Sequence, residues 1–116
     1  MSCTFYVACE LGAEVGRVML STLDKDKLTV SEIRRFQNIP LKEKESLRWD
    51  IPQLYQETLT GLREISEYEE PVHGISCSSW PSDYMLFDEA GSLMSPTFHR
   101  DDVRAGQTVT LTLPTA

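Results

Sequence analysis

The chain has 116 residues, of which 41% are hydrophobic and 25% charged, a composition that suits one soluble globular domain and excludes disorder throughout. Its formal net charge of -7 would repel a polyanion, so we expect no nucleic-acid partner. No apolar run approaches the roughly 20 residues of a membrane span, no secretory signal is visible at the start, and the three cysteines lack CxxC spacing. We therefore expect a cytoplasmic protein with no membrane partner and no disulfide framework.

Three strands are predicted at the start of the chain. Aromatic and β-branched residues favour strands over 4–11, 17–23 and 28–36. Two short connections, Gly12–Gly16 and Asp24–Lys27, separate them. Connections of this length join antiparallel strands but cannot join parallel ones, so the segment predicts an antiparallel meander.

One helix is predicted in the middle of the chain, after a charged segment over 37–48 that we expect to be a solvated loop. Asp50 suits the N-cap position, and Pro52 falls in the first turn, where its missing N–H costs nothing. Apolar residues then recur at three- and four-residue spacing as far as Ile65. Gly61 weakens the helix interior and predicts close packing against a neighbouring element.

The second half of the chain predicts further strands over 72–79, 84–88 and 108–113, with a hairpin turn over 89–92 leading to 93–94. With the meander and the helix, this order indicates an α/β or α+β layer with a mixed sheet.

Several single residues are expected to have structural roles. His73 and His99 lack acidic or cysteine neighbours at metal-ligand spacing, so we expect surface or strand-end histidines. Cys9 and Cys77 lie within predicted strands, and we expect both to be buried, inert thiols. Trp49 and Trp80 are expected to anchor the core.

The segment Gly12 to Arg17 carries the first functional pattern, GAEVGR between two strands. Glycines allow a turn to adopt positive φ and to expose backbone N–H groups, which can bind phosphate oxygens beside an arginine. No Gly-Lys-Ser/Thr follows, and no helix follows at once, so neither a P-loop nor a dinucleotide fingerprint fits. A plain hairpin turn and a phosphate cradle both remain open from the residues alone.

The whole chain resembles the amino-terminal end of the FGGY carbohydrate kinases, in particular the rhamnulokinase branch. The similarity begins in FYVACELGAEVGRVMLSTLDKDKLTVSEIRRFQN and continues at Trp49–Ile51, Ile75–Trp80, Asp83–Tyr84 and Pro96–Asp101. It covers roughly residues 4 to 102. We therefore expect residues 1–102 to form part of the family's N-terminal domain and 103–116 to be a divergent tail without function.

The resemblance implies a truncated α/β N-terminal subdomain of the actin-like ATPase (ribonuclease H-like) fold, in which an antiparallel three-strand meander is followed by a helix and further strands. It implies transfer of the ATP γ-phosphoryl group to a hydroxyl of a ketose such as L-rhamnulose, with Mg²⁺ as cofactor. It places nucleotide contacts on Ala13, Glu14, Val15, Gly16 and Arg17. It further places sugar contacts on Trp80, Pro81 and Asp83, and a metal contact on Glu10.

The chain departs from the family pattern at several of these positions. Glu10 replaces an aspartate, which moves the carboxylate by about 1.5 Å, and misplacement of that size can cost on the order of 100-fold in rate. Val15 replaces a small hydroxyl residue, Ser78 an aspartate, and Pro81 a glycine. The family's catalytic base and second lobe lie beyond this chain, so the resemblance assigns no catalytic residue here and predicts that the isolated chain is inactive.

Two alternatives remain open. In the first alternative, the chain is a degenerate, non-catalytic remnant or an interaction module that self-associates through exposed strand edges. Alternatively, it derives from a glycerol- or xylulose-kinase relative, because most of the residues that select the sugar would lie downstream.

Overall fold

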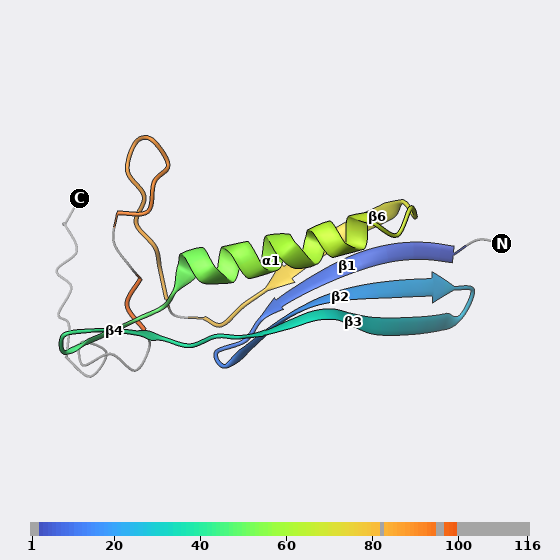
Figure 1. Cartoon of the computed structure of the whole chain (residues 1–116). Helices are drawn as coiled ribbons and strands as arrows, with labels where there is room; N and C mark the ends of the chain where they lie inside the picture. Colours follow the sequence, from blue (N-terminus) through green and yellow to red (C-terminus); the bar gives the residue numbers. More distant parts are fainter. Residues whose placement is uncertain (1–2, 82, 95–96, 100–116) are drawn as a thin grey trace, which may run out of the picture.

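The computed structural model describes residues 3–81, 83–94 and 97–99. Its main body is a four-stranded sheet of order β3-β2-β1-β6, with helix α1 lying along one face (Figure 1). The α/β class is confirmed, as is the expected succession of a meander, a helix and a further strand. The strands of this sheet are β1 (Cys3–Leu11), β2 (Val15–Asp24), β3 (Lys27–Gln37) and β6 (Val72–Ser78).

The antiparallel meander is confirmed. β1 pairs with β2 from Cys3 opposite Asp24 to Leu11 opposite Gly16, and β2 pairs with β3 along its full length. A register shift between Val18 and Met19 interrupts the second ladder. The first turn of the meander therefore lies at one end of the sheet and the second turn at the other.

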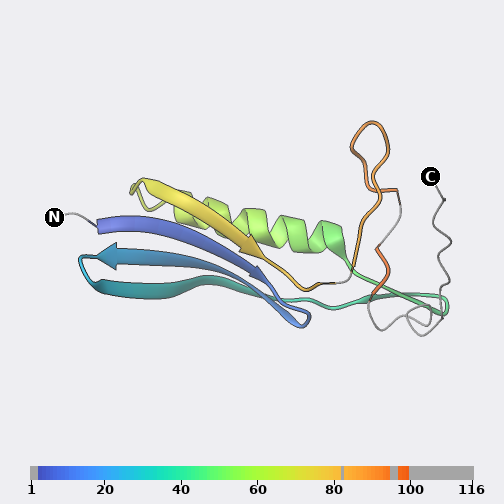
Figure 2. The ribbon, with the colours of Figure 1, turned by 180° about the vertical axis from the view of Figure 1, so that it is seen from behind.

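Strand β6 joins the sheet in parallel with β1, after the chain has crossed over through α1. Figure 2 shows β6 beside β1 from behind. Because β6 is an edge strand, six of its seven residues are exposed. Our expectation that Cys77 is buried is therefore wrong: its side chain is exposed, whereas Cys9 on the interior strand β1 is buried as expected.

Helix α1 (Ile51–Ser66) begins as its sequence predicts. The Asp50 carboxylate accepts a hydrogen bond from the Gln53 N–H, and a proline occupies the first turn. Leu54 and Ile65 are buried on the helix face that packs mainly against β2 and β3. They complete a core whose members from the sheet are Val7, Cys9, Val18 and Phe36.

Gly61 allows α1 to approach β2 closely, as we predicted. A Cβ atom built on Gly61 would lie 2.7 Å from Cγ2 of Val18, which is fully buried. Beside this contact, Arg34 on β3 donates hydrogen bonds to Glu57 at 2.8 Å and Glu64 at 3.0 Å, both on α1. Apolar packing and a forked ion pair thus hold the helix on the sheet.

The sequence-based expectation of a loop over 37–48 is wrong. This segment contains a small hairpin of β4 (Leu41–Glu43) and β5 (Ser46–Arg48). Lys44 takes a positive φ of 58° in the turn between the two strands. This turn brings the two charged strands together as an antiparallel ladder.

The expected strand over 84–88 does not form. Within the ranges that the structure describes, this segment makes a single bridge, from Phe87 to Leu93, and no strand lies alongside it to complete a ladder. The hairpin turn expected after it is confirmed, with Asp88 Oδ1 accepting from the backbone N–H groups of Ala90 and Ser92. The expected strand over 108–113 and the divergent tail over 103–116 lie outside the described residues.

In the described part of the chain, α1 falls short of the length and apolar character that crossing a membrane would require.

Candidate functional site

The first candidate site is the glycine turn, residues 12–16, which joins β1 to β2. The Gly12 N–H donates to the Val15 carbonyl at 2.9 Å, which closes the turn. Asn38, just beyond β3, holds the turn from the side: its Nδ2 donates to the Gly12 carbonyl and its backbone N–H donates to the Glu14 carbonyl, both at 2.9 Å. The turn is therefore fixed at the end of the sheet before any ligand arrives.

The glycines of this turn are needed for space and not for left-handed backbone. Glycine allows positive φ, but among the described residues positive φ is found at Lys25, Lys44 and Gly91 and not at Gly12 or Gly16. A Cβ on Gly12 would lie 2.7 Å from the Val15 carbonyl oxygen, and one on Gly16 would lie 2.2 Å from Cε2 of Phe36.

The residues predicted to contact the nucleotide divide into two groups. Ala13 and Glu14 form the turn itself, and Glu14 is exposed. Val15, Gly16 and Arg17 already belong to β2, which has β1 on one side and β3 on the other. An anion approaching the end of the sheet would therefore meet the backbone of Ala13 and Glu14 first.

Arg17 and Glu10 are register partners on β2 and β1, and their side chains form an ion pair at 2.5 Å. The hydrogen bond and the negative charge of Glu10 raise the pKa of Arg17 above its ordinary value, so the guanidinium stays charged at any working pH. This pair places one fixed cation near the glycine turn, but the cation is already engaged by a carboxylate.

The resemblance assigns Mg²⁺ to Glu10, and the residues around Glu10 do not fit that ion. Protein-bound Mg²⁺ is held by one or two carboxylates together with phosphate or water oxygens. Here the single carboxylate is neutralised by Arg17. Within the described ranges, no group of three or more His, Cys, Asp or Glu side chains is placed to hold a metal ion.

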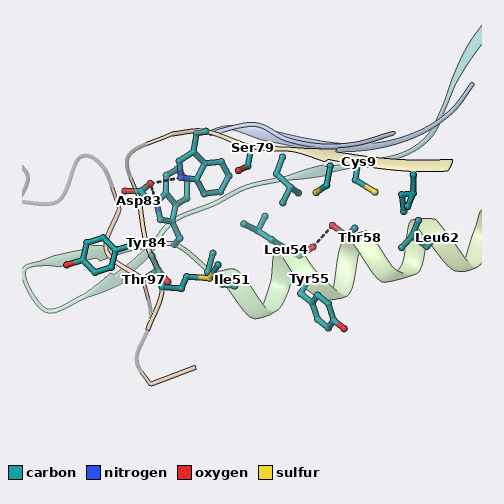
Figure 3. A pocket seen from close by; sticks show the side chains of 16 residues that line it. Cys9, Ile51, Leu54, Tyr55, Thr58, Leu62, Ser79, Asp83, Tyr84 and Thr97 are labelled. Carbon is teal, nitrogen blue, oxygen red and sulfur yellow. Dashed lines mark hydrogen bonds between the residues drawn. The ribbon is translucent and has the colours of Figure 1, made fainter. Parts of the chain in front are cut away.

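The second candidate site is a cavity of about 410 Å³ between α1, β6 and the segment that follows β6 (Figure 3). Its wall is mainly apolar, formed by residues such as Leu11, Ile51, Leu54, Leu62, Ile75 and Met85. Two of the residues predicted to contact the sugar, Trp80 and Asp83, line it. Pro81 is exposed and is not part of the lining.

The polar end of this cavity is organised around Asp83. Its Oδ2 accepts a hydrogen bond from Nε1 of Trp49 at 2.6 Å and another from Nε1 of Trp80. The two indole rings stack with centroids 4.1 Å apart. Both indole N–H groups are therefore committed to Asp83 and are not free to donate to a sugar.

Three residues at this end, Trp49, Thr97 and His99, have features that sequence reasoning missed. Trp49 is fully buried, as expected of a core anchor, but it also stacks on His99 at a centroid distance of 3.9 Å. His99 is therefore buried and not at the surface, whereas His73 is exposed as expected. Thr97 lines the same cavity with a buried hydroxyl that has no hydrogen-bond partner. A buried threonine beside an aromatic stack has no signature in one sequence.

The comparisons with known proteins agree on one group. No family model matches the chain. A rhamnulokinase from Mannheimia succiniciproducens is 37% identical over 82% of this chain, and one from Bacillus subtilis is 34% identical over 90% of it. In each case the matched region is 21% of the relative, so the chain spans about one fifth of the length of these proteins.

The solved structures with a similar fold are also sugar kinases. A gluconate kinase from Lactobacillus acidophilus matches 84% of the chain with a TM-score of 0.68 at 10% identity. A carbohydrate kinase from Novosphingobium aromaticivorans matches 83% with a TM-score of 0.66 at 22% identity. Each match covers 20% of the other chain. The chain is therefore similar to rhamnulokinases over about one fifth of their length, and over that part it has the actin-like fold of the sugar-kinase structures.

Proposed function

We propose that this chain is the nucleotide-side, amino-terminal portion of an ATP-dependent carbohydrate kinase of the rhamnulokinase type. The observation that carries the proposal is the 37% identity to a rhamnulokinase over 82% of the chain, in a region that folds as a meander with a rigid first turn. The complete protein would transfer the ATP γ-phosphoryl group to a hydroxyl of a ketose such as L-rhamnulose in the cytoplasm.

The glycine turn is the part of this chain that would meet ATP. Anionic oxygens bind well to backbone N–H groups presented by a preformed turn, because no ordering of the turn has to accompany binding. Ala13 and Glu14 would present these groups, and Arg17 would contribute a positive charge from the next strand. Since Arg17 already pairs with Glu10 at 2.5 Å, a phosphate would share the guanidinium with that carboxylate or displace it. We therefore expect weak ATP binding.

The cavity between α1 and β6, which is the second candidate site, would form one wall of the sugar site. Asp83 is its candidate hydroxyl acceptor, but Oδ2 is occupied by two indole N–H groups, which leaves Oδ1 for a ligand. Trp80 would offer its ring, and Pro81, outside the cavity lining, would shape the chain between them. The mainly apolar wall gives few other groups for a polyhydroxylated substrate, so the residues that select the sugar belong to the rest of the protein.

We propose that this chain by itself does not catalyse phosphoryl transfer. The reaction requires an aligned hydroxyl, a general base and metal-bridged phosphates. The family's base lies in the region that this chain does not match, and Glu10 does not provide a magnesium site. Any Mg²⁺ would arrive on ATP, with its protein ligands supplied by the remaining four fifths of the homologous enzyme.

Calorimetric titration of the chain with Mg-ATP, together with an assay for ADP release in the presence of L-rhamnulose, tests this proposal. We expect binding of Mg-ATP with a dissociation constant in the millimolar range and no ADP release above the rate without protein. The variant Val15→Ser restores a hydroxyl to the turn and should tighten binding, whereas Thr22→Ser, at the far end of the same strand, serves as a matched control. Turnover by the chain alone would refute the assignment of the base to the missing part.

A second candidate function is that of an interaction module, favoured by the open edge of β6. Among the described residues this strand pairs with β1 alone, and Ile75 on it is 62% exposed. An unprotected edge of this kind can pair with another strand. Light scattering over rising protein concentration should then show dimers, and a monodisperse monomer at all concentrations would argue against this function.

A further inference from the structure

The thiols of Cys9 and Cys77 come together in the fold, although 67 residues separate them in the sequence. The two residues are direct register partners on the parallel strands β1 and β6. Both side chains line the cavity beside α1, so they lie on the same face of the sheet. Figure 3 shows Cys9 in this lining. Neither takes part in a disulfide. Nothing in the proposed kinase chemistry uses them.

The two thiols differ in their exposure. Cys77 is exposed on the edge strand, whereas Cys9 is only 4% exposed. Burial, with a smaller contribution from the neighbouring Cys77, raises the pKa of the Cys9 thiol. A thiol-reactive compound from solution would therefore meet Cys77 first and reach Cys9 only from that attachment point.

The spacing of this pair suits a bridging atom better than a direct S–S bond. Neighbouring strands lie about 4.8 Å apart, and because side chains stand roughly perpendicular to the sheet, the Cβ atoms of paired residues are about as far apart as the strands. The Cβ atoms of a disulfide are usually closer, about 3.8 Å apart. An atom with two bonds to sulfur spans a wider gap than one S–S bond. The apolar cavity next to the thiols, with Leu54 and Leu62 in its wall, can receive a carbon substituent on that atom.

We propose that Cys9 and Cys77 form a dithiol site that binds a monosubstituted trivalent arsenical, R–As=O, with its organic group in the adjoining apolar cavity. The two S–H bonds and the As=O bond are broken, two As–S bonds form, and the oxygen leaves with both protons as water. No atom changes its oxidation state, so no oxidant is needed. Cys77 forms the first bond and Cys9 closes the chelate, because the first bond gives the second thiol a high effective concentration.

Cys3 provides an internal control for this site. It lies on β1, six residues before Cys9, which corresponds to about 20 Å along an extended strand. No single arsenic atom can join those two thiols in the folded chain. Cys3 should therefore stay free when one equivalent of arsenical has bound.

The test uses the full chain, reduced and folded, with one equivalent of phenylarsine oxide. Intact-mass spectrometry should show one adduct, and subsequent alkylation should modify one thiol per chain instead of three, which peptide mapping should identify as Cys3. A tenfold excess of 2-mercaptoethanol should leave this adduct in place, whereas 1,2-ethanedithiol should remove it.

The variants separate the chelate from a single attachment. Cys77→Ser, on the exposed strand, should abolish the mercaptoethanol-resistant adduct without affecting folding, and Cys3→Ser should leave it intact. Cys9→Ser should leave an adduct that mercaptoethanol removes. Two alkylated thiols in the wild-type adduct, or equal resistance in Cys77→Ser, would overturn the proposal. So would an equally resistant adduct in the chain unfolded by urea, because the site would then not depend on the sheet register.

Discussion

The contact between Gly61 and Val18 makes a prediction in which two opposing effects can be weighed. In an exposed helix, Gly61→Ala would stabilise the fold by about 0.8–1 kcal/mol, because alanine has the higher helix propensity. Here the new Cβ would lie 2.7 Å from Cγ2 and 2.8 Å from Cβ of Val18. Val18 is fully buried and branched at Cβ, so it cannot move aside easily. Overpacking of this kind costs about 1–3 kcal/mol.

The steric effect should therefore exceed the gain in propensity, and Gly61→Ala should lower the free energy of unfolding by about 1 kcal/mol. Urea unfolding followed by tryptophan fluorescence measures this change, since Trp49 is fully buried in the native state. The matched control is Gln56→Ala on the exposed part of the same helix, which should change stability by less than about 0.5 kcal/mol.

The double variant Val18→Ala/Gly61→Ala isolates the contact. With the valine methyl groups removed, the alanine at 61 should become stabilising, by about 0.5–1 kcal/mol relative to Val18→Ala alone. If Gly61→Ala stabilised the wild-type chain by the same amount as it stabilised the Val18→Ala background, the claim that Gly61 sets the distance between α1 and β2 would be refuted.

Three further predictions concern other contacts. Asn38→Ala leaves the Gly12 carbonyl without its side-chain donor and should lower the unfolding free energy by about 1–3 kcal/mol in urea titrations, whereas no change would show that the turn holds itself. Arg34→Met removes two partly exposed ion pairs and should lower the free energy of unfolding more at low salt than in 1 M NaCl; equal losses at both salt concentrations would contradict an ionic role. The pKa of Cys9 is raised in the folded chain, so the unfolded chain loses this proton at a lower pH than the folded chain does. The free energy of unfolding should therefore keep its full value below pH 9.0 and should fall as the pH rises further. In Cys9→Ala the free energy of unfolding should lack this fall with pH. The same pH dependence in both proteins would contradict the prediction.

The sequence predicted those elements whose patterns are local. The aromatic and β-branched residues over 4–11, 17–23 and 28–36, together with the short turns, predicted the meander, and Asp50 with Pro52 predicted the start of the helix. These signals depend on backbone conformation and capping, which neighbouring residues determine. Val72–Ser78 was predicted as a strand for the same reason.

The features that sequence reasoning missed depend on which element lies next to which. Cys77 has the composition of a buried strand around it, yet β6 lies at the sheet edge, and only the strand order shows this. The residues over 84–88 have strand propensity, but the described part of the chain offers them no partner strand. Likewise, glycine is needed at position 16 because the ring of Phe36, twenty residues later, lies against it.

The candidate site was predicted in part. The resemblance indicated the glycine turn and the segment from Trp80 to Asp83, and the structure places Trp80 and Asp83 in one cavity wall. It did not indicate that Asp83 accepts from both tryptophans, that Arg17 is held by Glu10, or that Asn38 fixes the turn. These are side-chain contacts between segments far apart in the sequence, and no local pattern encodes them.

The claim that the glycine turn receives the phosphates of ATP is tested most directly by the amide ¹H–¹⁵N spectrum of the chain during titration with ATP. We predict that the signals of Ala13, Glu14 and Arg17 shift progressively with ATP and much less with adenosine, while those of the β4–β5 hairpin stay in place. The account would be contradicted if ATP and adenosine shifted these signals equally. It would also be contradicted if ATP shifted only signals of residues outside the turn.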